Sequence, residues 1–594
     1  MTSDAGIAGR DPGSGYDLAP SIRLPPGHVV HRGAAVWELL RGAAQGGRPV
    51  VVVDAYPGAD LESLRGQLRE GLPGFDVVDA ETAARDPGAI AAWMQADLTD
   101  DRVFGVLSHA TIDALYDPDA VAALRRRIAE RERGVALVGW GAAWIVPSAD
   151  VVVLGELARW EIQLRYRAGM PNWHAENSGE DVLRKIKRGY FVEWRIADRH
   201  KRPLLETADF VLDLNTPEDP AMVTGAAFRA GLDAAVSRPF RVVPYFDPGV
   251  WGGQWMRRVF GLPGDAPNYA WSFDGVPEEN SLLFDDGASA FQLPAIDAVL
   301  ARPRELLGER TFARFGAEFP IRFDLLDTMG GGNLSLQVHP LTDYIRDRFG
   351  MAYTQDESYY LLDAAEGAVV HLGLKTGVDR ERMAADLAAA QSGEAPFPAE
   401  EYVNAFPARR HDHFAIPAGT VHCSGAGSMV LEISATPYLF TFKMWDWGRA
   451  GLDGMPRPIH LDHALANIQW DRDTAWVERE LLGRVQPVAE GEGWIEERTG
   501  LHELEFIEVR RHWFTAAVPH HTRGTLHVLN LVEGEEAVVE SPSGAFEPFV
   551  VHYAETFIVP AAVGPYSIRP HGRGEGRRLA TVKAFVRCTE RPGD

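Results

Sequence analysis

The sequence predicts a multidomain protein in which an N-terminal α/β domain with a parallel sheet precedes a double β-barrel region that carries a helical insertion. Three observations lead to this fold class. The chain has 594 residues, which is too long for a single hydrophobic core. Apolar runs alternate with helical segments up to about residue 235, as in parallel α/β domains. Beyond it, short strands and turn residues dominate, which is typical of all-β domains.

The composition excludes several classes of protein. A formal net charge of −25 argues against a general nucleic-acid or anionic-membrane binder, although a locally basic pocket could still bind a phosphorylated ligand. The two cysteines, Cys423 and Cys588, cannot build a disulfide framework and fit a reducing cytosol. The polar, Gly-rich N-terminus shows no signal peptide, so we expect a cytoplasmic protein.

The α/β domain is expected over residues 21–235, after a tail at residues 1–20 whose Gly-, Asp-, Ser- and Pro-rich composition predicts disorder. Buried strands are predicted at residues 49–54, 103–107, 135–139, 151–154 and 210–214. Helices are predicted at residues 34–44, 61–72, 120–132 and 157–168. Because strands and helices alternate, we expect the strands to lie parallel in one sheet.

The turn at residues 55–60 lies where a P-loop would bind phosphate. Such a loop needs Gly-x4-Gly-Lys-Ser/Thr, because glycines turn backbone N–H groups toward the phosphates and the Lys and hydroxyl bind phosphate and Mg²⁺. Here Ala55, Asp60, Leu61 and Glu62 occupy the four signature positions, and two of them would repel phosphate. The strand spacing nevertheless resembles the uridine-kinase-like P-loop family, and the resemblance implies a degenerate, non-phosphorylating domain.

A basic run of Arg and Lys residues in this domain resembles the basic lid of that family. The alternative is that these residues form a solvated helix face. Structural or regulatory use of the domain is favoured over nucleotide binding, and Leu61 at the lysine position disfavours a kinase activity. The run comprises Arg159, Arg165, Arg167, Lys185, Lys187, Arg188 and Arg195.

Near residue 239 the alternation of strands and helices gives way to short strands rich in Gly and Trp, and this change marks the start of the second half of the chain. We expect a metal-binding barrel domain over residues 236–495, with a helical insertion at residues 379–391 and a helix at residues 461–467. A second β domain, without a metal site, is expected over residues 496–594. Its strands at residues 525–532 and 556–558 repeat the pattern of the first barrel.

Four side chains in the second half have the order of a divalent-metal site. Residues 334–340 alternate as a strand, so Gln337 and His339 project from one face. Glu357 opens the next strand, and His422 ends a Pro-x-Gly-x-x-His turn. Each alone is more often a packed residue, but together they have the layout of a cupin. This nitrogen and oxygen ligand set suits zinc in a catalytic site, although iron, manganese and cobalt accept the same ligands.

Residues 239–588 resemble the class I, cupin-type mannose-6-phosphate isomerases, and are most like the short bacterial form. The resemblance implies that Gln337, His339, Glu357 and His422 are zinc ligands. It further implies an aldose–ketose isomerase that acts on mannose 6-phosphate, fructose 6-phosphate or a related sugar through a cis-enediol. It is carried by ordered blocks at residues 244–245, 251–253, 323–327, 334–340, 357–360, 416–422, 431–433, 442–449 and 458–461.

The sequence departs from this family at the substrate-binding end. The family usually has a lysine two residues before the ligand glutamate, where this chain has Gln355, and an arginine where Lys443 stands. Its Ser-Asp pair is not evident at residues 436–439. Because lysine cannot bind phosphate in the bidentate way of arginine, a non-catalytic, metal-containing sensor of a sugar or sugar phosphate is the alternative to an isomerase. A bifunctional kinase–isomerase is a further alternative, which Leu61 at the P-loop lysine position disfavours.

Four residues are candidates for acid–base chemistry or substrate contact: Glu432, Lys443, Asp446 and Arg449. Glu432 has an alternative role, as the partner that orients a metal ligand. Asp446 and Arg449 have one as well, as a simple ion pair. The sequence leaves the oligomeric state open.

Overall fold

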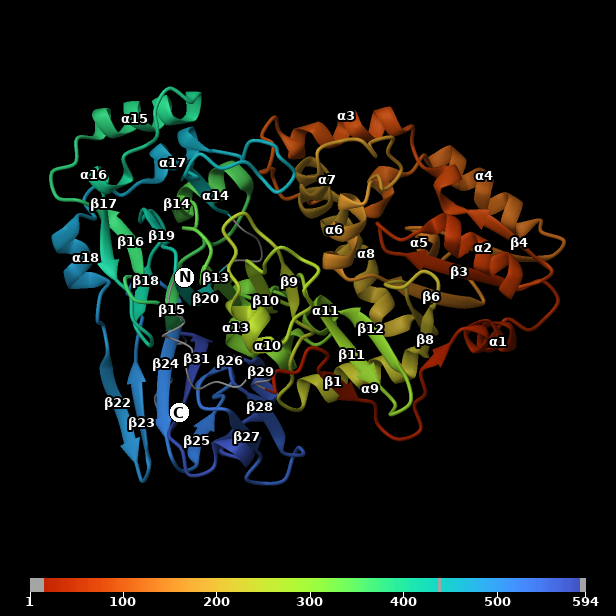
Figure 1. The fold of residues 1–594 in the computed structure, drawn as a ribbon. Helices are drawn as coiled ribbons and strands as arrows, with labels where there is room; N and C mark the ends of the chain where they lie inside the picture. The colour runs from red at the N-terminus through yellow and green to blue at the C-terminus, as the bar shows by residue number, and fades with distance from the viewer. Residues whose placement is uncertain (1–14, 436–439, 501, 588–594) are drawn as a thin grey trace. The chain divides into compact units, whose positions relative to one another are not determined.

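The computed structural model describes residues 15–435, 440–500 and 502–587. The chain divides into two compact units, which are drawn in Figure 1. The N-terminal unit comprises Pro20–Ala235 and Pro277–Arg302. The sandwich unit comprises Met1–Ala19, Val236–Val276 and Pro303–Asp594. None of the helices in the described residues is long and apolar enough to cross a bilayer.

A seven-stranded sheet forms the centre of the N-terminal unit. The five strands from β7 to β4 are parallel, which confirms the predicted parallel sheet, and β8 and β2 extend it in the antiparallel sense. Their order is β2 (His31–Arg32), β8 (Ala221–Thr224), β7 (Phe210–Asp213), β6 (Val151–Glu156), β3 (Val50–Ala55), β5 (Gly134–Val138) and β4 (Phe75–Asp79).

Helices cover both faces of this sheet, and its strands are therefore buried on both sides. Val51 and Val53 of β3 pack with Leu40 of α1 and Leu64 of α2 on one face. On the other face, Asp54 meets the α8 helix. The helices are α1 (Ala34–Ala43), α2 (Leu61–Gly71), α3 (Pro87–Leu98), α4 (Pro118–Ala129), α5 (Ala142–Ile145), α6 (Arg159–Arg167), α7 (Val182–Arg188), α8 (Trp194–Thr207), α9 (Gly225–Val236) and α11 (Ile296–Ala301).

A small second sheet completes the N-terminal unit. It consists of β1 (Ser21–Arg23), β11 (Ser281–Asp285) and β12 (Ala290–Pro294). Two of its strands come from Pro277–Arg302, a segment that lies inside the predicted metal-binding domain in the sequence. The reason is that β1 pairs in parallel with β11 and so recruits this hairpin.

The predicted strand at residues 103–107 is wrong, because this segment forms no strand. Its N–H groups bond outside the sheet: Val106 donates to the carbonyl of Asp97, and nearby Ser108 donates to that of Phe191. Phe104 is buried there, which explains the apolar pattern. The edge position in the sheet is taken by β4 instead.

The loop after β3 is not arranged as a phosphate site. Asp60 caps α2 by accepting a hydrogen bond from Ser63 N at 3.0 Å, so a carboxylate lies where a phosphate would bind. Three cations of the basic run, Arg165, Lys185 and Lys187, are buried and donate to backbone carbonyls, whereas Arg167 is exposed. Arg165, for example, donates to Gly58 O and Leu214 O. These side chains hold loops together, and the predicted P-loop character has no support.

Two facing sheets form the first sandwich of the sandwich unit. One has the strand order β18 (His413–Ile416), β15 (Glu357–Ala364), β20 (Ser428–Ser434), β13 (Arg322–Asp327), β10 (Trp271–Gly275) and β9 (Tyr245–Asp247). The other has the order β17 (Val403–Pro407), β16 (Val369–Leu374), β19 (His422–Ser424), β14 (Leu336–Val338) and β21 (Phe442–Trp445).

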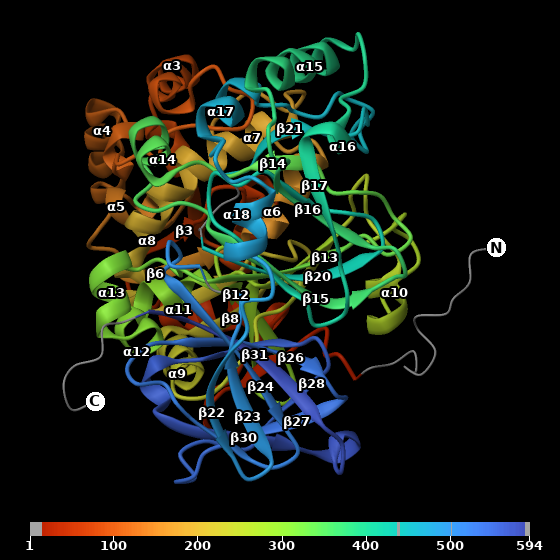
Figure 2. The same ribbon diagram turned by 90° about the vertical axis from the view of Figure 1, so that its left-hand side faces the viewer.

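Helices border the first sandwich, and the predicted helical insertion is confirmed as α15. In Figures 1 and 2, α15, α16 and α17 lie at the end of this sandwich that is remote from the second one. The helices of the unit are α10 (Trp255–Phe260), α12 (Pro303–Leu307), α13 (Glu309–Phe315), α14 (Thr342–Phe349), α15 (Arg380–Ser392), α16 (Ala399–Tyr402), α17 (Leu461–Asn467) and α18 (Thr474–Glu480).

A second sandwich follows, drawn in blue in Figure 2. One sheet has the order β22 (Gln486–Gly491), β23 (Trp494–Arg498), β24 (Ile507–Phe514), β31 (Leu579–Val586), β26 (His527–Glu533) and β29 (Thr556–Val559). The other has the order β25 (Val518–His521), β30 (Pro565–Pro570), β27 (Glu536–Glu540) and β28 (Phe549–His552).

Neither sandwich is the closed barrel that we predicted. Among the described residues each sheet ends in edge strands, and the two sheets of a sandwich are held by packing across a shared interior rather than by a continuous hydrogen-bonded ladder. The predicted alternation of interior and exterior side chains survives this correction, because it depends on the strands and not on closure.

A buried charge network joins the two sandwiches. Arg241 lies 2.6 Å from Glu555, next to β29, and 3.5 Å from Asp274 of β10. Tyr16 donates a hydrogen bond of 2.5 Å to Asp274, so residues 15–19, inside the stretch predicted to be disordered, have defined contacts. Thr556 N donates to the second oxygen of Asp274 at 2.8 Å. The network thus connects Tyr16 and both sandwiches to the Arg241 cation.

Replacing Arg241 with methionine should lower the free energy of unfolding by about 3–5 kcal/mol, because Asp274 and Glu555 would remain buried without their cation. Urea denaturation of the full chain measures this change. Arg569→Met is the control, since Arg569 pairs with Glu540 at the surface, where the side chains are 38% and 31% exposed. Its expected cost is below about 1 kcal/mol, and equal losses in the two variants would contradict the assignment.

Candidate metal centre

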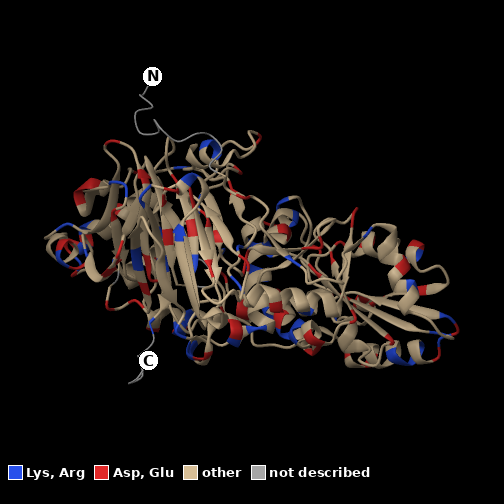
Figure 3. Ribbon diagram, turned by 90° about the horizontal axis from the view of Figure 1, so that it is seen from below, with Lys and Arg blue, Asp and Glu red and all other residues tan. Residues whose placement is uncertain are grey.

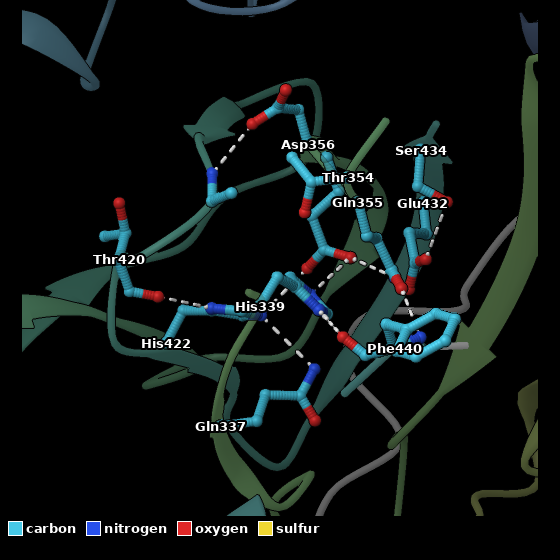
Figure 4. Close-up of polar contacts among 12 residues, drawn as sticks. Gln337, His339, Thr354, Gln355, Asp356, Thr420, His422, Glu432, Ser434 and Phe440 are labelled. Atoms are coloured by element: carbon cyan, nitrogen blue, oxygen red, sulfur yellow. Dashed lines mark hydrogen bonds and ion pairs between the residues drawn. The ribbon is translucent and has the colours of Figure 1, made fainter. Parts of the chain in front are cut away.

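The candidate metal centre lies between the two sheets of the first sandwich (Figure 4). Glu357 begins β15 in the six-stranded sheet, whereas Gln337 and His422 belong to β14 and β19 of the five-stranded sheet. Gln337 is paired with His422, so both side chains project from one face. His339 directly follows β14, two residues after Gln337. The structure therefore brings together the four side chains that we predicted as ligands.

Three of these side chains direct their ligand atoms toward one point. Nε2 of His339 lies 3.0 Å from Oε2 of Glu357, and Nε2 of His422 lies 2.8 Å from Oε1. The three ligand atoms lie within 4.8 Å of one another, and all three residues are buried. In the described part of the chain, this is the one group of three His, Cys, Asp or Glu side chains with such geometry.

Backbone carbonyls fix the orientation of both imidazoles. Nδ1 of His339 lies 2.9 Å from Phe440 O, and Nδ1 of His422 lies 2.9 Å from Thr420 O. Because a carbonyl oxygen can only accept, both Nδ1 atoms carry a proton, and Nε2 is the ring atom that each histidine has left to bind a metal ion. Hydrogen-bonded Nδ1–H groups are the usual outer contacts of metal-ligating histidines. The donor set therefore fits a divalent metal ion.

The site contains buried polar atoms that a cation would satisfy. Among the described residues, His339 Nε2 and Glu357 Oε1 make no hydrogen bond of acceptable geometry, although they lie at ion-pair distance from their neighbours. An unsatisfied buried group costs about 1–3 kcal/mol. Burial alone would raise the pKa of Glu357, but the two imidazoles lower it well below its usual range. The carboxylate is thus ready to bind a cation.

Gln337 lies beside this group with its amide nitrogen turned inward. Its Nε2 lies 3.2 Å from His422 Nε2, while Ser335 donates a hydrogen bond of 3.0 Å to its oxygen. A half-turn about the last side-chain bond exchanges the two amide atoms and would present the oxygen to a metal ion. The two orientations have nearly the same shape, so the exchange requires no repacking.

A buried polar strip on the six-stranded sheet borders the same interior. Glu432 lies opposite Tyr359 of β15 and opposite Asp324 of β13, so the three share the face of Glu357. Burial, together with the charges of Glu357 and Asp324, raises the pKa of Glu432 well above its usual range. Ser434 donates a hydrogen bond of 3.0 Å to it. Glu432 is therefore a buried carboxyl with a raised pKa beside the candidate ligands.

The sequence did not single out Arg322, and it showed Gln355 only as a departure from the family's lysine. Arg322 is buried on the same face and donates to Asp324 at 2.6 Å; the alternation of residues 322–327 was the signal that could have found it. Gln355 donates to Glu357 at 3.0 Å and accepts from Phe440 N at 3.2 Å. Because Phe440 O also holds His339, Gln355 links two candidate ligands and does not merely replace a lysine.

The remaining candidates lie on and after β21. Lys443 is paired with Gln337 in the antiparallel ladder, so it projects toward the same interior. Asp446 binds Arg449 and, at 2.6 Å, Arg457, which extends the ion pair that we considered for Asp446 and Arg449. Residues 436–439, where the family's Ser-Asp pair was sought, and Cys588 lie outside the described residues.

Comparison with known proteins identifies curated relatives for part of the chain. It is 26% identical over 218 residues to the mannose-6-phosphate isomerase of Streptococcus mutans serotype c (strain ATCC 700610 / UA159), a match that covers 36% of this chain and 63% of that protein. It is 24% identical over 234 residues to mannose-6-phosphate isomerase ManA of Bacillus subtilis (strain 168), covering 39% of this chain and 69% of that protein. A region of the chain is therefore similar in sequence to mannose-6-phosphate isomerases, and the match spans less than two thirds of the first relative's length.

Solved structures and a family match complete the comparison. The crystal structure of mannose 6-phosphate isomerase from Bacillus subtilis matches with a TM-score of 0.47 and 18% identity, covering 59% of this chain and 99% of that one. A mutant phosphomannose isomerase from Salmonella typhimurium matches with a TM-score of 0.45 and 17% identity, covering 59% and 100%. Residues 34–237 match a domain of unknown function (DUF8485), which lends the uridine-kinase-like resemblance no support.

Removing either histidine ligand should abolish stoichiometric metal binding. We expect His339→Ala and His422→Ala to weaken zinc affinity by more than about 100-fold, since changes to mere outer contacts of metal ligands already cost about 10–100-fold. Competition with a chromogenic chelator measures the affinity. His371→Ala on neighbouring β16 is the control and should change it less than about twofold. A wild-type chain that binds no divalent ion after zinc loading would refute the assignment.

Proposed function

We propose that the protein is a metal-dependent aldose–ketose isomerase that acts on a sugar phosphate. The observation that carries this proposal is the convergence of His339, Glu357 and His422 in a buried interior, with both Nε2 atoms next to the carboxylate. The homology of part of the chain to mannose-6-phosphate isomerases supports the reaction class. Mannose 6-phosphate and fructose 6-phosphate are the first substrates to test.

An aldose–ketose isomerase moves a proton between C1 and C2 of the open-chain sugar. A base removes the C2 proton, which yields a cis-enediol, and the proton returns at C1. A metal ion held by His339, Glu357, His422 and the reoriented Gln337 would supply stabilisation of negative charge on the sugar oxygens. We assign the proton transfer to Glu432, because its buried carboxyl lies on the face of Glu357 and has a raised pKa.

Cationic side chains would bind the substrate's phosphate. Lys443 is the candidate that faces the interior from β21, beside Gln337. As a point charge it attracts phosphate without the bidentate geometry of arginine, so we expect weak discrimination among phosphorylated sugars. Asp446 and Arg449 stay candidates for substrate contact, with Arg457 as a third member of their ion network.

A non-catalytic sensor is the second candidate function. The specific observation in its favour is Gln355, which occupies the position where the family usually has a lysine. Its amide nitrogen donates to Glu357 and its amide oxygen accepts from Phe440 N, so neither is directed to a substrate. A sensor would bind a sugar or sugar phosphate without exchanging its protons. The two functions therefore differ in one measurable property, exchange at the sugar carbons.

Zinc-loaded protein should incorporate deuterium at C1 or C2 of one sugar phosphate when the reaction is run in D₂O. Proton NMR of a panel of sugars and sugar phosphates measures this incorporation and names the substrate. The same sample treated with a chelator is the control and should show no exchange. Binding of a sugar phosphate without exchange in the zinc-loaded sample would replace the isomerase with the sensor.

Glu432→Gln should lower turnover by about 10²–10⁴-fold while metal content stays at the wild-type level, because general acid–base catalysis contributes that much. Steady-state kinetics and metal analysis measure the two quantities. Glu505→Gln is the matched control, because Glu505 is also a buried carboxyl with a raised pKa in the same unit. Loss of metal from the Glu432→Gln variant would instead make Glu432 a residue that orients the ligands.

A further inference from the structure

The interior of the second sandwich contains a cavity of about 370 Å³. Strand alternation directs Glu496 of β23, His512 of β24 and Lys583 of β31 into it, and His520 of β25 faces them from the four-stranded sheet. Farther along the same interior, the equivalent positions carry Phe514 and other apolar side chains of the core. The interior is therefore apolar at one end and polar at the other.

The polar end is built by hydrogen bonds among buried groups. Lys583 Nζ lies 3.4 Å from Nδ1 of His520 and 3.6 Å from Oε1 of Glu496, and His512 Nε2 lies 3.2 Å from the same oxygen. His527 Nδ1 lies 2.8 Å from the hydroxyl of Tyr566. Each of the three histidines and Lys583 is at least nine-tenths buried.

These contacts assign the free ring atoms. An ammonium group can only donate, so His520 Nδ1 accepts from Lys583 and His520 Nε2 carries a proton. The carboxylate of Glu496 accepts from His512 Nε2, so His512 Nδ1 has a lone pair. Within the described residues both His520 Nε2 and His512 Nδ1 are buried without a hydrogen-bond partner. A donor and an acceptor on two rings whose centroids are 4.6 Å apart suit a hydroxyl group, which both donates and accepts.

The histidines are neutral, and the charge of the cavity comes from other residues. Burial lowers the pKa of His512 to about 4 and the pKa values of His520 and His527 well below the usual range. Burial also lowers the pKa of Lys583, to about 8, so most of it is charged at neutral pH. The other charged side chains that line the cavity are Glu496, Arg310, Arg510 and Arg523.

This cavity is locally positive in an acidic protein. Its cations outnumber its carboxylates even when Glu508, which pairs with Arg510, is counted. The whole chain has a formal net charge of −25, and the positions of acidic and basic residues are interspersed along the ribbon in Figure 3. Aromatic side chains of Trp494 and Phe585 add flat apolar walls, on which the C–H face of a sugar can pack.

We propose that the second sandwich holds a separate binding site for a small polyhydroxylated anion, such as a phosphorylated sugar or a sugar acid. The ligand's hydroxyl groups meet His512 and His520, and its anionic group meets Lys583 and the arginines of the cavity. The volume lies within the usual range of small-molecule sites, about 300–1,000 Å³. This site is independent of the candidate metal centre in the first sandwich.

The test uses the full chain with mannose 6-phosphate and gluconate as probes, and with mannose and inorganic phosphate as single-feature probes. Hydrogen–deuterium exchange measured by mass spectrometry should show protection in peptides that cover residues 494–514, 518–527 and 579–586. This readout is local, so it separates the proposed site from the metal centre. We expect the two polyhydroxylated anions to protect these peptides more strongly than mannose or phosphate does.

Variants connect the protection to the cavity. Lys583→Met should weaken binding at this site at least about tenfold, since a charge-assisted hydrogen bond is lost. Arg523→Met at the exposed rim serves as a second variant that leaves the buried cluster intact, and we expect weaker binding of the anions but not of mannose. Arg569→Met, on the surface of the same sandwich, should leave binding within about twofold of the wild type.

Three outcomes would overturn the proposal. One is protection confined to the first sandwich with every probe. Another is equal protection by mannose and by the two anions, since the cations would then have no role. The third is unchanged affinity in both Lys583→Met and Arg523→Met. Each of these outcomes would mean that the cavity is not a site for a polyhydroxylated anion and that water forms the hydrogen bonds of His512 Nδ1 and His520 Nε2.

Discussion

The alternation of side chains in two facing β-sheets is the constraint on which the sandwich unit depends. Every second residue of a strand enters a shared interior, so residues distant in sequence become neighbours once the sheets pack. Gln337 and His422 meet Glu357 in this way, from different sheets. The same geometry directs His512 and Lys583 toward His520 in the second sandwich. Sandwich packing thus creates two polar interiors with different chemistry.

The two interiors differ in the charge of the ligand that they suit. In the first sandwich, the Nε2 atoms of His339 and His422 lie next to the Glu357 carboxylate, and this donor set suits a divalent cation. In the second, Lys583 lies beside Glu496 and neutral histidines, and further cations line the cavity, so an anion is favoured. Burying such groups is unfavourable unless each finds a partner, which is why unsatisfied atoms in both interiors point to ligands. One sheet architecture can therefore serve opposite electrostatic requirements.

Outer contacts determine what the candidate ligands can do. Phe440 holds His339 through its carbonyl and Gln355 through its N–H, and Gln355 in turn donates to Glu357. A single backbone position thus orients two ligand side chains from different strands. A glutamine at position 355 is therefore compatible with the candidate metal centre. Because Gln355 has no positive charge, binding of a substrate phosphate would depend on Lys443 and the other cations of the interior.

The sequence by itself determined the local features of the protein. Strand alternation predicted that Gln337 and His339 share a face, and the ordered motifs selected Glu357 and His422 as their companions. Helix periodicity located α15 and α17, and the repeated βα pattern predicted the parallel sheet. These features follow from residues near one another in the chain, for which local propensity and periodicity carry the information.

Tertiary structure alone decided which distant residues meet. It recruited the hairpin of Pro277–Arg302 into the N-terminal unit, kept residues 103–107 out of the sheet, and left the sandwiches open rather than closed as barrels. It also assembled the cluster of His512, His520 and Lys583, which has no motif because its members come from three strands with unrelated spacing. The physical reason is that sheet order and packing depend on the burial of many side chains from distant parts of the chain. The sequence of a short segment does not include those partners.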